Sequence, residues 1–178
     1  LIRDIIKELR EDLSFNNDSL KSNDVNIAYC PERVIPGNIL FELKNNNRVL
    51  GGITPECSEK AANFYSNFTD GKCFKTNSKT AEMTKLVENS SRDVQIAFAN
   101  ELSMICENLE INVWELISLA NHHPRVNILN PGPGVGGHCI AVDPWFIASA
   151  NPKESSLIQT ARKVNDFKAD WVVKQILK

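Results

Sequence analysis

The longest segment without a helix-breaking residue constrains the fold most strongly. Residues 79–108 contain neither glycine nor proline, the two residues least compatible with a helix interior. A single helix of that length would span roughly 45 Å, which is longer than an average globular helix. We therefore predict a long helix that runs between domains or between subunits. Its apolar positions include Leu86, Ile96, Ala97, Phe98, Leu102 and Ile105.

The remainder of the second half is also predicted to be mainly helical. Apolar residues at helical spacing indicate a second helix near residues 113–120 and a third over about 154–177. The apolar residues on or near one face of the third helix are Leu157, Ile158, Ala161, Val164 and Trp171.

The first part of the chain has a different pattern. Apolar spacing over residues 1–13 predicts the end of an amphipathic helix, and the polar residues 14–24 predict a loop. Short apolar runs predict strands, with a helix over 58–68 between two of them. This strand–helix–strand order predicts the end of a parallel α/β sheet. The predicted strands are 25–29, 48–53 and 73–76, and the apolar face of the helix comprises Ala61, Ala62, Phe64, Tyr65 and Phe68.

Charged residues follow the first predicted strand. Glu32 and Arg33 come directly after Cys30 and Pro31. Open α/β sheets bind their ligands at the carboxyl ends of the strands. We therefore expect Glu32 and Arg33 to lie at a ligand-binding edge.

Composition excludes several classes of protein. With 42% hydrophobic and 24% charged residues, the chain is typical of a globular domain. A net charge of -2 and scattered basic residues argue against a nucleic-acid partner, and no apolar run is long enough for a membrane span. Five cysteines without a C-x-x-C pair predict reduced thiols in a cytoplasmic protein. Because the sequence lacks an initial Met and begins inside a helical pattern, we expect a piece of a longer protein.

A glycine-rich loop over residues 130–145 is the most informative motif. Four glycines and two prolines within residues 131–137 exclude a helix or a central strand. The spacing also matches G-x-G-x-x-G, but the strand before it, the helix after it and the distant acidic residue of a dinucleotide motif are missing. We interpret the segment as a loop that backbone and ligand can approach closely, with N–H groups suited to an anion.

Two reactive side chains follow these glycines. Cys139 and Asp143 suit covalent catalysis, in which the carboxylate accepts a proton or orders water. The alternative is a buried, inert Cys139 and an Asp143 that only forms a turn before Pro144. A metal site is not expected, because neighbouring side chains diverge in both candidate pairs, His122–His123 and His138–Cys139.

On the predicted long helix, Lys85 and Asn89 are four residues apart and share one face. Glu82 and Asp93 lie near the same stripe. By itself this pattern is more typical of a solvated helix face with i,i+4 pairs.

Taken together, these motifs resemble the UDP-glucose/GDP-mannose dehydrogenase family. The resemblance is carried by Cys30-Pro31-Glu32-Arg33, by residues 80–89 with Lys85 and Asn89, and by Gly136-Gly137-His138-Cys139 through Asp143-Pro144. Within the family, residues 26–37, 111–147 and 160–166 are most similar to bacterial members that act on UDP-N-acetyl-D-mannosamine. The resemblance covers nearly the whole chain.

The family resemblance implies an NAD-dependent, four-electron oxidation of a sugar C6 alcohol to a carboxylate. It assigns Cys139 as the nucleophile, Lys85 and Asn89 to the developing oxyanion, and Asp143 to proton transfer or water ordering. It assigns Glu32 both to the cofactor and to the water that hydrolyses a thioester. The residues it assigns to substrate binding are Arg33, Arg125, Gly136, Gly137 and His138, with Arg125 reaching the substrate of a partner subunit.

The resemblance also implies a domain organisation. Residues 1–77 would end an NAD-binding Rossmann domain with a parallel sheet, residues 78–165 would form a helical domain that dimerises through the long helix, and residues 166–178 would lead into a UDP-sugar-binding domain. Because the N-terminal dinucleotide motif is missing, the chain by itself is expected to be inactive.

Alternatives remain for the substrate and for the class of protein. Relatives that oxidise UDP-glucose usually have a second glutamate at the position of Pro36, so its absence favours an N-acetylated hexosamine. UDP-N-acetylglucosamine and UDP-glucose remain alternative substrates. A helical dimerisation module without chemistry is the alternative of another class.

Overall fold

The computed structural model describes residues 2–13, 15 and 25–178. It divides into two compact units, one reaching to Lys85 and the other running from Leu86 to Lys178. Most of the predicted loop at 14–24 lies outside the described residues. None of the described helices combines the length and the apolar character that a bilayer crossing requires.

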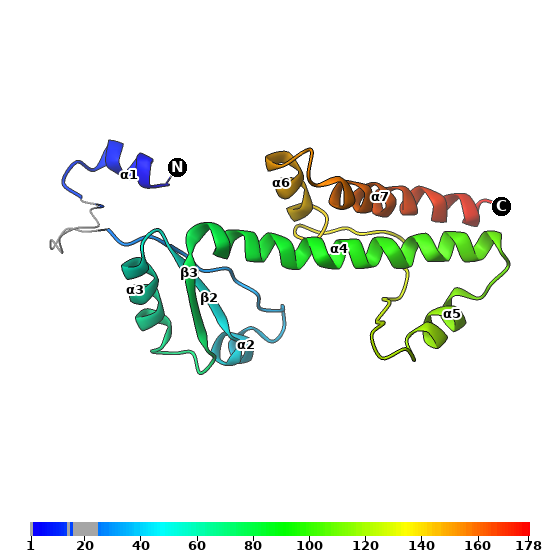
Figure 1. Cartoon of the computed structure of the whole chain (residues 1–178), viewed down its shortest axis with the longest axis horizontal. Coiled ribbons are helices and arrows are strands. Elements are labelled where there is room, and N and C mark those ends of the chain that lie inside the picture. Colours follow the sequence, from blue (N-terminus) through cyan, green and yellow to red (C-terminus); the bar gives the residue numbers. More distant parts are fainter. Residues whose placement is uncertain (1, 14, 16–24) are drawn as a thin grey trace. The chain divides into compact units, whose positions relative to one another are not determined.

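The first unit contains a small sheet with helices around it (Figure 1). Its N-terminal helix is shorter than the predicted 1–13 and has no buried residue. The elements in chain order are α1 (Ile2–Leu9), β1 (Ala28–Tyr29), α2 (Ile39–Asn45), β2 (Arg48–Gly52), α3 (Pro55–Tyr65) and β3 (Cys73–Asn77).

The sheet is mixed, which corrects the predicted parallel sheet. β2 lies between its neighbours, pairing antiparallel with β1 and parallel with β3. The β2–β3 connection contains α3 and crosses over, as parallel strands require. The β1–β2 connection contains only the seven-residue α2 and stays at one edge of the sheet. Glu32 and Arg33 therefore follow the carboxyl end of β1 and lie toward the start of β2, and the expectation that this edge binds a ligand stays a prediction.

Two glycines allow close packing around β2. A β-carbon on Gly51 would lie 2.4 Å from the Ala81 β-carbon, and one on Gly52 would lie 2.4 Å from the Ser58 backbone nitrogen. Leu50 and Ala81 are completely buried. The core of the first unit therefore depends on missing side chains as much as on apolar ones.

Helix α3 begins earlier than predicted, because its start signal precedes the apolar run. The Thr54 hydroxyl accepts a 3.2 Å hydrogen bond from the Cys57 backbone N–H, and Pro55 occupies the first turn. Threonine caps and early prolines favour helix starts. Helix α3 ends at Tyr65, so Phe68 lies outside it, and Phe64 is exposed rather than part of an apolar core.

The second unit consists of helices and the glycine-rich loop (Figure 1). The long helix, α4 (Ser78–Asn108), is confirmed as one uninterrupted element that begins in the first unit and continues into the second. The predicted helices at 113–120 and 154–177 correspond to α5 (Val113–Ala120) and α7 (Ser156–Ile176). Helix α6 (Asp143–Ala150) was not predicted.

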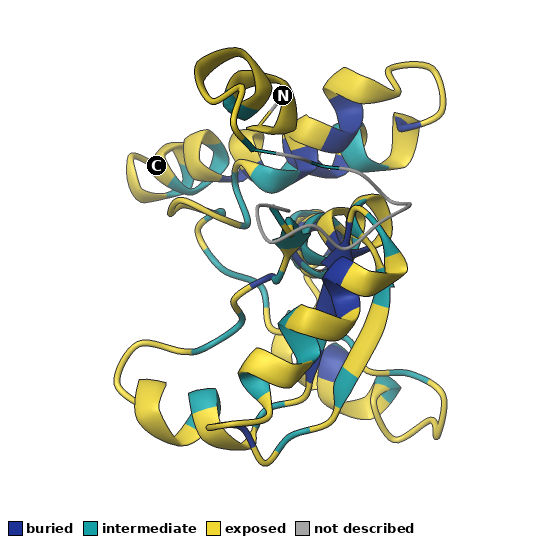
Figure 2. Ribbon diagram, turned by 90° about the vertical axis from the view of Figure 1, so that its left-hand side faces the viewer, coloured by how far each residue is buried: buried dark blue, intermediate teal, exposed yellow. Residues whose placement is uncertain are grey.

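Helix α7 lies beside the second-unit part of α4, and buried polar groups join them. Arg162 Nη1 lies 2.7 Å from Asp93 Oδ1, and these two side chains are 2% and 0% exposed. Apolar burial is modest by comparison, and exposed positions cover much of the ribbon in Figure 2. The two predicted domain boundaries, at 77/78 and 165/166, stay predictions.

Candidate active site

Cys139 lies in the turn that leads into α6. Its side chain is exposed, which argues against the alternative of a buried, inert thiol. Its carbonyl oxygen accepts hydrogen bonds from the backbone N–H groups of Val142, at 3.0 Å, and Asp143, at 2.8 Å. The nucleophile candidate is therefore held one helical turn ahead of the first residue of α6.

Asp143 joins the loop to the long helix. Asn89 Nδ2 donates a 2.6 Å hydrogen bond to Asp143 Oδ2, and Asn89 is only 6% exposed. The structure thus brings together three predicted site residues from α4, the loop and α6. Because Asp143 is the first residue of α6, its negative charge also lies at the favourable end of that helix dipole.

Lys85 lies one turn before Asn89 on α4, half-buried. Its ammonium forms no hydrogen bond or ion pair with another described residue. Since α4 is continuous, Lys85 and Asn89 share a face of it. Asn89 and Asp93, one turn further along, are both buried, so this part of the stripe is not a solvated helix face, whereas Glu82 at its start is exposed.

Glu32 has a well-defined environment in the first unit. Its Oε2 lies 2.8 Å from Arg48 Nη1, and its Oε1 accepts hydrogen bonds from the backbone N–H groups of Arg33, at 2.7 Å, and Val34, at 3.0 Å. Partial burial raises the pKa of Glu32, but the hydrogen bonds from Arg48 and the two amides outweigh it and hold the pKa below its ordinary value. Glu32 is therefore ionised at neutral pH.

The side chains of the remaining predicted binding residues have other surroundings. Arg33 donates a 2.9 Å hydrogen bond to the Asn47 carbonyl. Arg125 and His138 are exposed, and the Arg125 backbone N–H lies 3.3 Å from His123 Nδ1. Space is open where β-carbons on Gly136 and Gly137 would lie. The described residues contain no group of three or more His, Cys, Asp or Glu side chains arranged for a metal ion.

Sequence reasoning missed a buried polar network in the second unit. It consists of Asp93 and Asn100 on α4 and Arg162 and Asn165 on α7, each at most 2% exposed. The two members on α7, Arg162 and Asn165, lie within residues 160–166, one of the stretches that carry the family resemblance. The available signal was the pair of polar residues three apart on a helix, Arg162 and Asn165, next to apolar neighbours.

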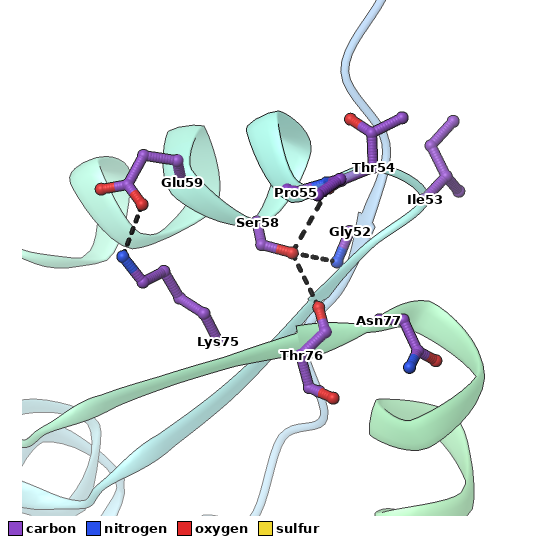
Figure 3. Close-up of a pocket in the computed structure, with 9 residues that line it drawn as sticks. All are labelled: Gly52, Ile53, Thr54, Pro55, Ser58, Glu59, Lys75, Thr76 and Asn77. Carbon is purple, nitrogen blue, oxygen red and sulfur yellow. Dashed lines mark hydrogen bonds and ion pairs between the residues drawn. The ribbon is translucent and has the colours of Figure 1, made fainter. Parts of the chain in front are cut away.

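A pocket of about 420 Å³ lies in the first unit at the carboxyl ends of β2 and β3 (Figure 3). Ser58 is its central hydroxyl, and it accepts from the Gly52 N–H at 2.8 Å and donates to the Thr76 carbonyl at 2.7 Å. The Lys75 ammonium is paired with Glu59. These side chains are engaged in holding β2, β3 and α3 together, and none of the predicted site residues lines this pocket.

Comparisons with known proteins agree with these motifs. The UDP-glucose/GDP-mannose dehydrogenase family matches twice, with its NAD binding domain over residues 2–69 and its central domain over residues 79–167. The UDP-N-acetyl-D-mannosamine dehydrogenase of Escherichia coli strain K12 is 63% identical over 96% of this chain and 41% of its own length. An NDP-N-acetyl-D-galactosaminuronic acid dehydrogenase of Ralstonia nicotianae is 57% identical over 98% of this chain and 41% of its own length.

A solved structure has the same fold. The UDP-D-ManNAc dehydrogenase of Pyrococcus horikoshii is 38% identical, with a TM-score of 0.86 over 98% of this chain and 40% of its own. The chain thus spans about two fifths of the length of these relatives. With both family domains matched in order, the chain belongs to the UDP-glucose/GDP-mannose dehydrogenase family.

Proposed function

We propose that this chain is part of an NAD-dependent dehydrogenase that oxidises C6 of UDP-N-acetyl-D-mannosamine to the carboxylate, with Cys139 as its nucleophile. The exposed Cys139 thiol, one turn from an Asp143 held by Asn89, is the observation that carries the proposal. An exposed thiol is what covalent addition to a sugar aldehyde requires.

The reaction proceeds through an aldehyde at C6. The Cys139 sulfur adds to the aldehyde carbon, which forms a thiohemiacetal. Loss of a second hydride from this carbon gives a thioester, and water then cleaves the carbon–sulfur bond to release the carboxylate and restore the thiol. NAD supplies the acceptor for both hydrides.

Asn89 and Lys85 are proposed to stabilise the oxyanion that forms when sulfur adds. Asn89 Nδ2 carries two hydrogens, and one of them is used in the bond to Asp143. The other can be donated to the substrate oxygen. Lys85, on the same face of α4 one turn earlier, contributes a positive charge, and fixed donors of this kind act most strongly where charge develops.

Asp143 and Glu32 are proposed to handle water and protons. Asp143 takes the thiol proton or orders water beside Cys139. Glu32 is proposed for the cofactor and for the water of thioester hydrolysis. Its Oε1 accepts two hydrogen bonds and its Oε2 accepts one, so Oε2 keeps a lone pair with which Glu32 fits as a fixed acceptor for a hydroxyl group or for water.

The substrate and its binding residues are also part of the proposal. Gly136, Gly137 and His138 would contact the nucleotide sugar, because the glycines leave open space beside the exposed loop. Arg33 and Arg125 would bind its anionic groups, with Arg125 acting across a homodimer that forms through α4. The similarity to two relatives named for N-acetylated hexosamines supports this class of sugar. UDP-N-acetylglucosamine and UDP-glucose are the alternative substrates.

The decisive experiment replaces the nucleophile in the complete protein. Cys139→Ser is expected to abolish formation of the uronic acid while UDP-N-acetylmannosamine still binds, because a hydroxyl is a poor nucleophile without a strong base beside it. Cys73→Ser is the matched control, since Cys73 is a half-buried thiol on β3. Continued acid formation by Cys139→Ser would refute the proposal, and so would equal losses in both variants.

The non-catalytic alternative makes a different forecast for the same chain. A dimerisation module needs no reactive thiol, so Cys139→Ser would leave every measurable property unchanged. The exposure of Cys139 favours the enzyme.

A further inference from the structure

A continuous chain of buried hydrogen bonds links the two long helices of the second unit to the loop that carries Cys139. It begins at Asp93 on α4, whose Oδ1 accepts from Arg162 Nη1 at 2.7 Å and from Asn165 Nδ2 at 2.8 Å. Asn165 Nδ2 also donates to the Asp93 carbonyl at 3.0 Å. The two hydrogen bonds that Asn165 Nδ2 donates to Asp93 fix the orientation of the Asn165 amide.

The chain continues from Asn165 to the loop through one more amide. Asn100 Nδ2 donates to Asn165 Oδ1 at 2.9 Å, and Asn100 Oδ1 accepts from the Gly132 backbone N–H at 2.8 Å. Asn100 is 0% exposed and Asn165 is 1% exposed. Because each amide both donates and accepts within this chain, the Arg162–Asp93 ion pair at its start determines which way the amide dipoles point.

The loop also packs against α7 at the same asparagine. A β-carbon on Gly134 would lie 3.1 Å from the Asn165 carbonyl oxygen, and Gly134 has a φ of +134° that a side chain would strain. A hollow of about 430 Å³ separates the next part of the loop from α7. The loop entrance is therefore hydrogen-bonded to α4 at Gly132 and lies against α7 at Gly134.

The exit of the loop has its own attachment. Asn89 on α4 holds Asp143, and the backbone N–H of Asp143 holds the Cys139 carbonyl. Between the two attachments, β-carbons on Gly136 and Gly137 would meet nothing within 4 Å. The segment that carries Cys139 is thus hydrogen-bonded to α4 at both ends, through Asn100 and Asn89, and has open space beside the glycines in its middle.

We propose that Asn100 and Asn165 are positioning residues, which hold the entrance of the Cys139 loop and thereby set the position of the thiol. Neither residue touches the reacting atoms. The kinetic consequence rests on the proposed function of Cys139, whereas the structural consequence, a fixed loop entrance, does not.

Asn100→Leu in the complete protein tests this proposal. Leucine has a similar size but neither accepts from Gly132 nor donates to Asn165. Hydrogen–deuterium exchange should speed up in peptides covering residues 130–139. The kcat for acid formation should fall by about 10- to 100-fold, since displacement of a reacting group by about 1 Å has effects of this size. KM for the nucleotide sugar should change by less than about 3-fold, because the entrance bond acts on the thiol and not on the sugar.

Ser103→Ala is the matched control, because it removes another bond between the same two helices. Ser103 Oγ accepts from Lys168 Nζ at 2.6 Å and donates to the backbone carbonyl of Asn100 at 2.7 Å, so Ser103→Ala leaves the Asn100 side chain and its bonds to Gly132 and Asn165 in place. Loss of the Ser103 hydroxyl should leave the exchange of 130–139 and the kcat unchanged. Gly134→Ala perturbs the entrance from the loop side and should reproduce the effects of Asn100→Leu, which decides the matter if Asn100→Leu does not fold.

Unchanged exchange over 130–139 in Asn100→Leu and Gly134→Ala would overturn the proposal, as would equal effects in Ser103→Ala. A fall in kcat matched by an equal rise in KM would also overturn it. Failure of the proposed function has a different signature. In that case Cys139→Ser would still form the acid, whereas Asn100→Leu would still loosen the loop.

Discussion

Asn89 on the long helix donates a 2.6 Å hydrogen bond to Asp143, the first residue of α6. The two residues are 54 positions apart in the sequence. Asn89 is buried, and the proposed nucleophile lies on the turn that this bond anchors. The bond therefore gives Asn89 two roles, holding Asp143 and, in the proposed reaction, donating to the oxyanion.

Asn89→Ala should slow acid formation in the complete protein more than it weakens sugar binding. Loss of one oxyanion donor typically lowers the rate by about 100- to 1000-fold. The same change frees Asp143, so Asp143→Asn should slow the reaction as well. Because the two side chains act as one unit, the double variant should lose much less than the product of the single effects. Single-turnover rates and sugar affinities measure this, and fully multiplicative effects would contradict it.

Lys85→Ala should also reduce the rate more than the binding of the nucleotide sugar. The lost positive charge would no longer stabilise the thiolate or the oxyanion, for which about 100-fold or more is expected. Lys79→Ala is a suitable control, because Lys79 is an exposed base on the same helix. Steady-state kinetics of the complete protein provide the measurement. Equal effects of the two substitutions would show that Lys85 has no special role.

The five thiols should react with iodoacetamide in an order set by their environments. Cys139 is exposed and should be labelled first, whereas Cys57 and Cys106 are buried and should be labelled last. Burial raises the pKa of Cys30, despite a hydrogen bond with Tyr65 and the nearby charge of Arg48. Labelling of Cys30 should therefore keep rising with pH above about 8.5, the value of a free thiol.

Peptide mass spectrometry of the labelled chain measures this order. Cys139→Ser supplies the control, since it should remove the fastest phase and leave the slow phases unchanged. Labelling of Cys57 or Cys106 ahead of Cys139 would count against the exposed position of the loop thiol.

The elements with a strong local signal could be predicted from the sequence. The helix over 78–108 was evident because 30 consecutive residues, 79–108, lack both glycine and proline. The bounds predicted for β2 and β3 agree with the structure to within one residue. Helix α6 was missed because residues 130–145 were interpreted as one loop, although the last proline in this segment, Pro144, is well tolerated in a first turn.

The relations between distant residues could not be predicted. The direction of β1 relative to β2 depends on the path of residues 30–47, which have no pattern that distinguishes a return from a crossover. Asp93 and Arg162 are 69 positions apart, and each alone is typical of a solvated helix. Asn89 and Asp143 were assigned by resemblance, whereas their hydrogen bond comes from the fold alone.

Glu32 should make the stability of the first unit depend on pH. Its pKa is lower in the folded protein than in the unfolded chain, mainly because Arg48 and two backbone amides overcome the effect of partial burial. The stabilisation is therefore present above the unfolded value, near 4.5, and is lost as the pH falls through the lower folded value. With the Glu32 side chain 49% exposed, its size should be under about 1 kcal/mol.

Denaturant unfolding of the wild type and of Glu32→Gln at about pH 7 and about pH 3 measures this dependence. The difference between the two proteins should shrink at the lower pH. Arg48→Met provides a second check, because Glu32→Gln should have a smaller effect in that background, where only the two backbone amides still hold the carboxylate. A difference that stays constant with pH would contradict the linkage.

The proposed homodimer should depend on an exposed apolar stripe of α4. Val87, Phe98 and Ile105 are 49%, 52% and 46% exposed, and their spacing places them on one face of the helix. Phe98→Glu puts a charge into this stripe and should shift the complete protein toward monomer by at least about 10-fold in the dimer dissociation constant, because a buried unpaired charge disfavours association strongly. Arg92→Glu alters the exposed opposite face and should leave the dimer intact. Sedimentation velocity at micromolar concentration distinguishes the outcomes. A wild-type monomer, or equal behaviour of the two variants, would mean that Arg125 cannot reach a partner's substrate through this helix.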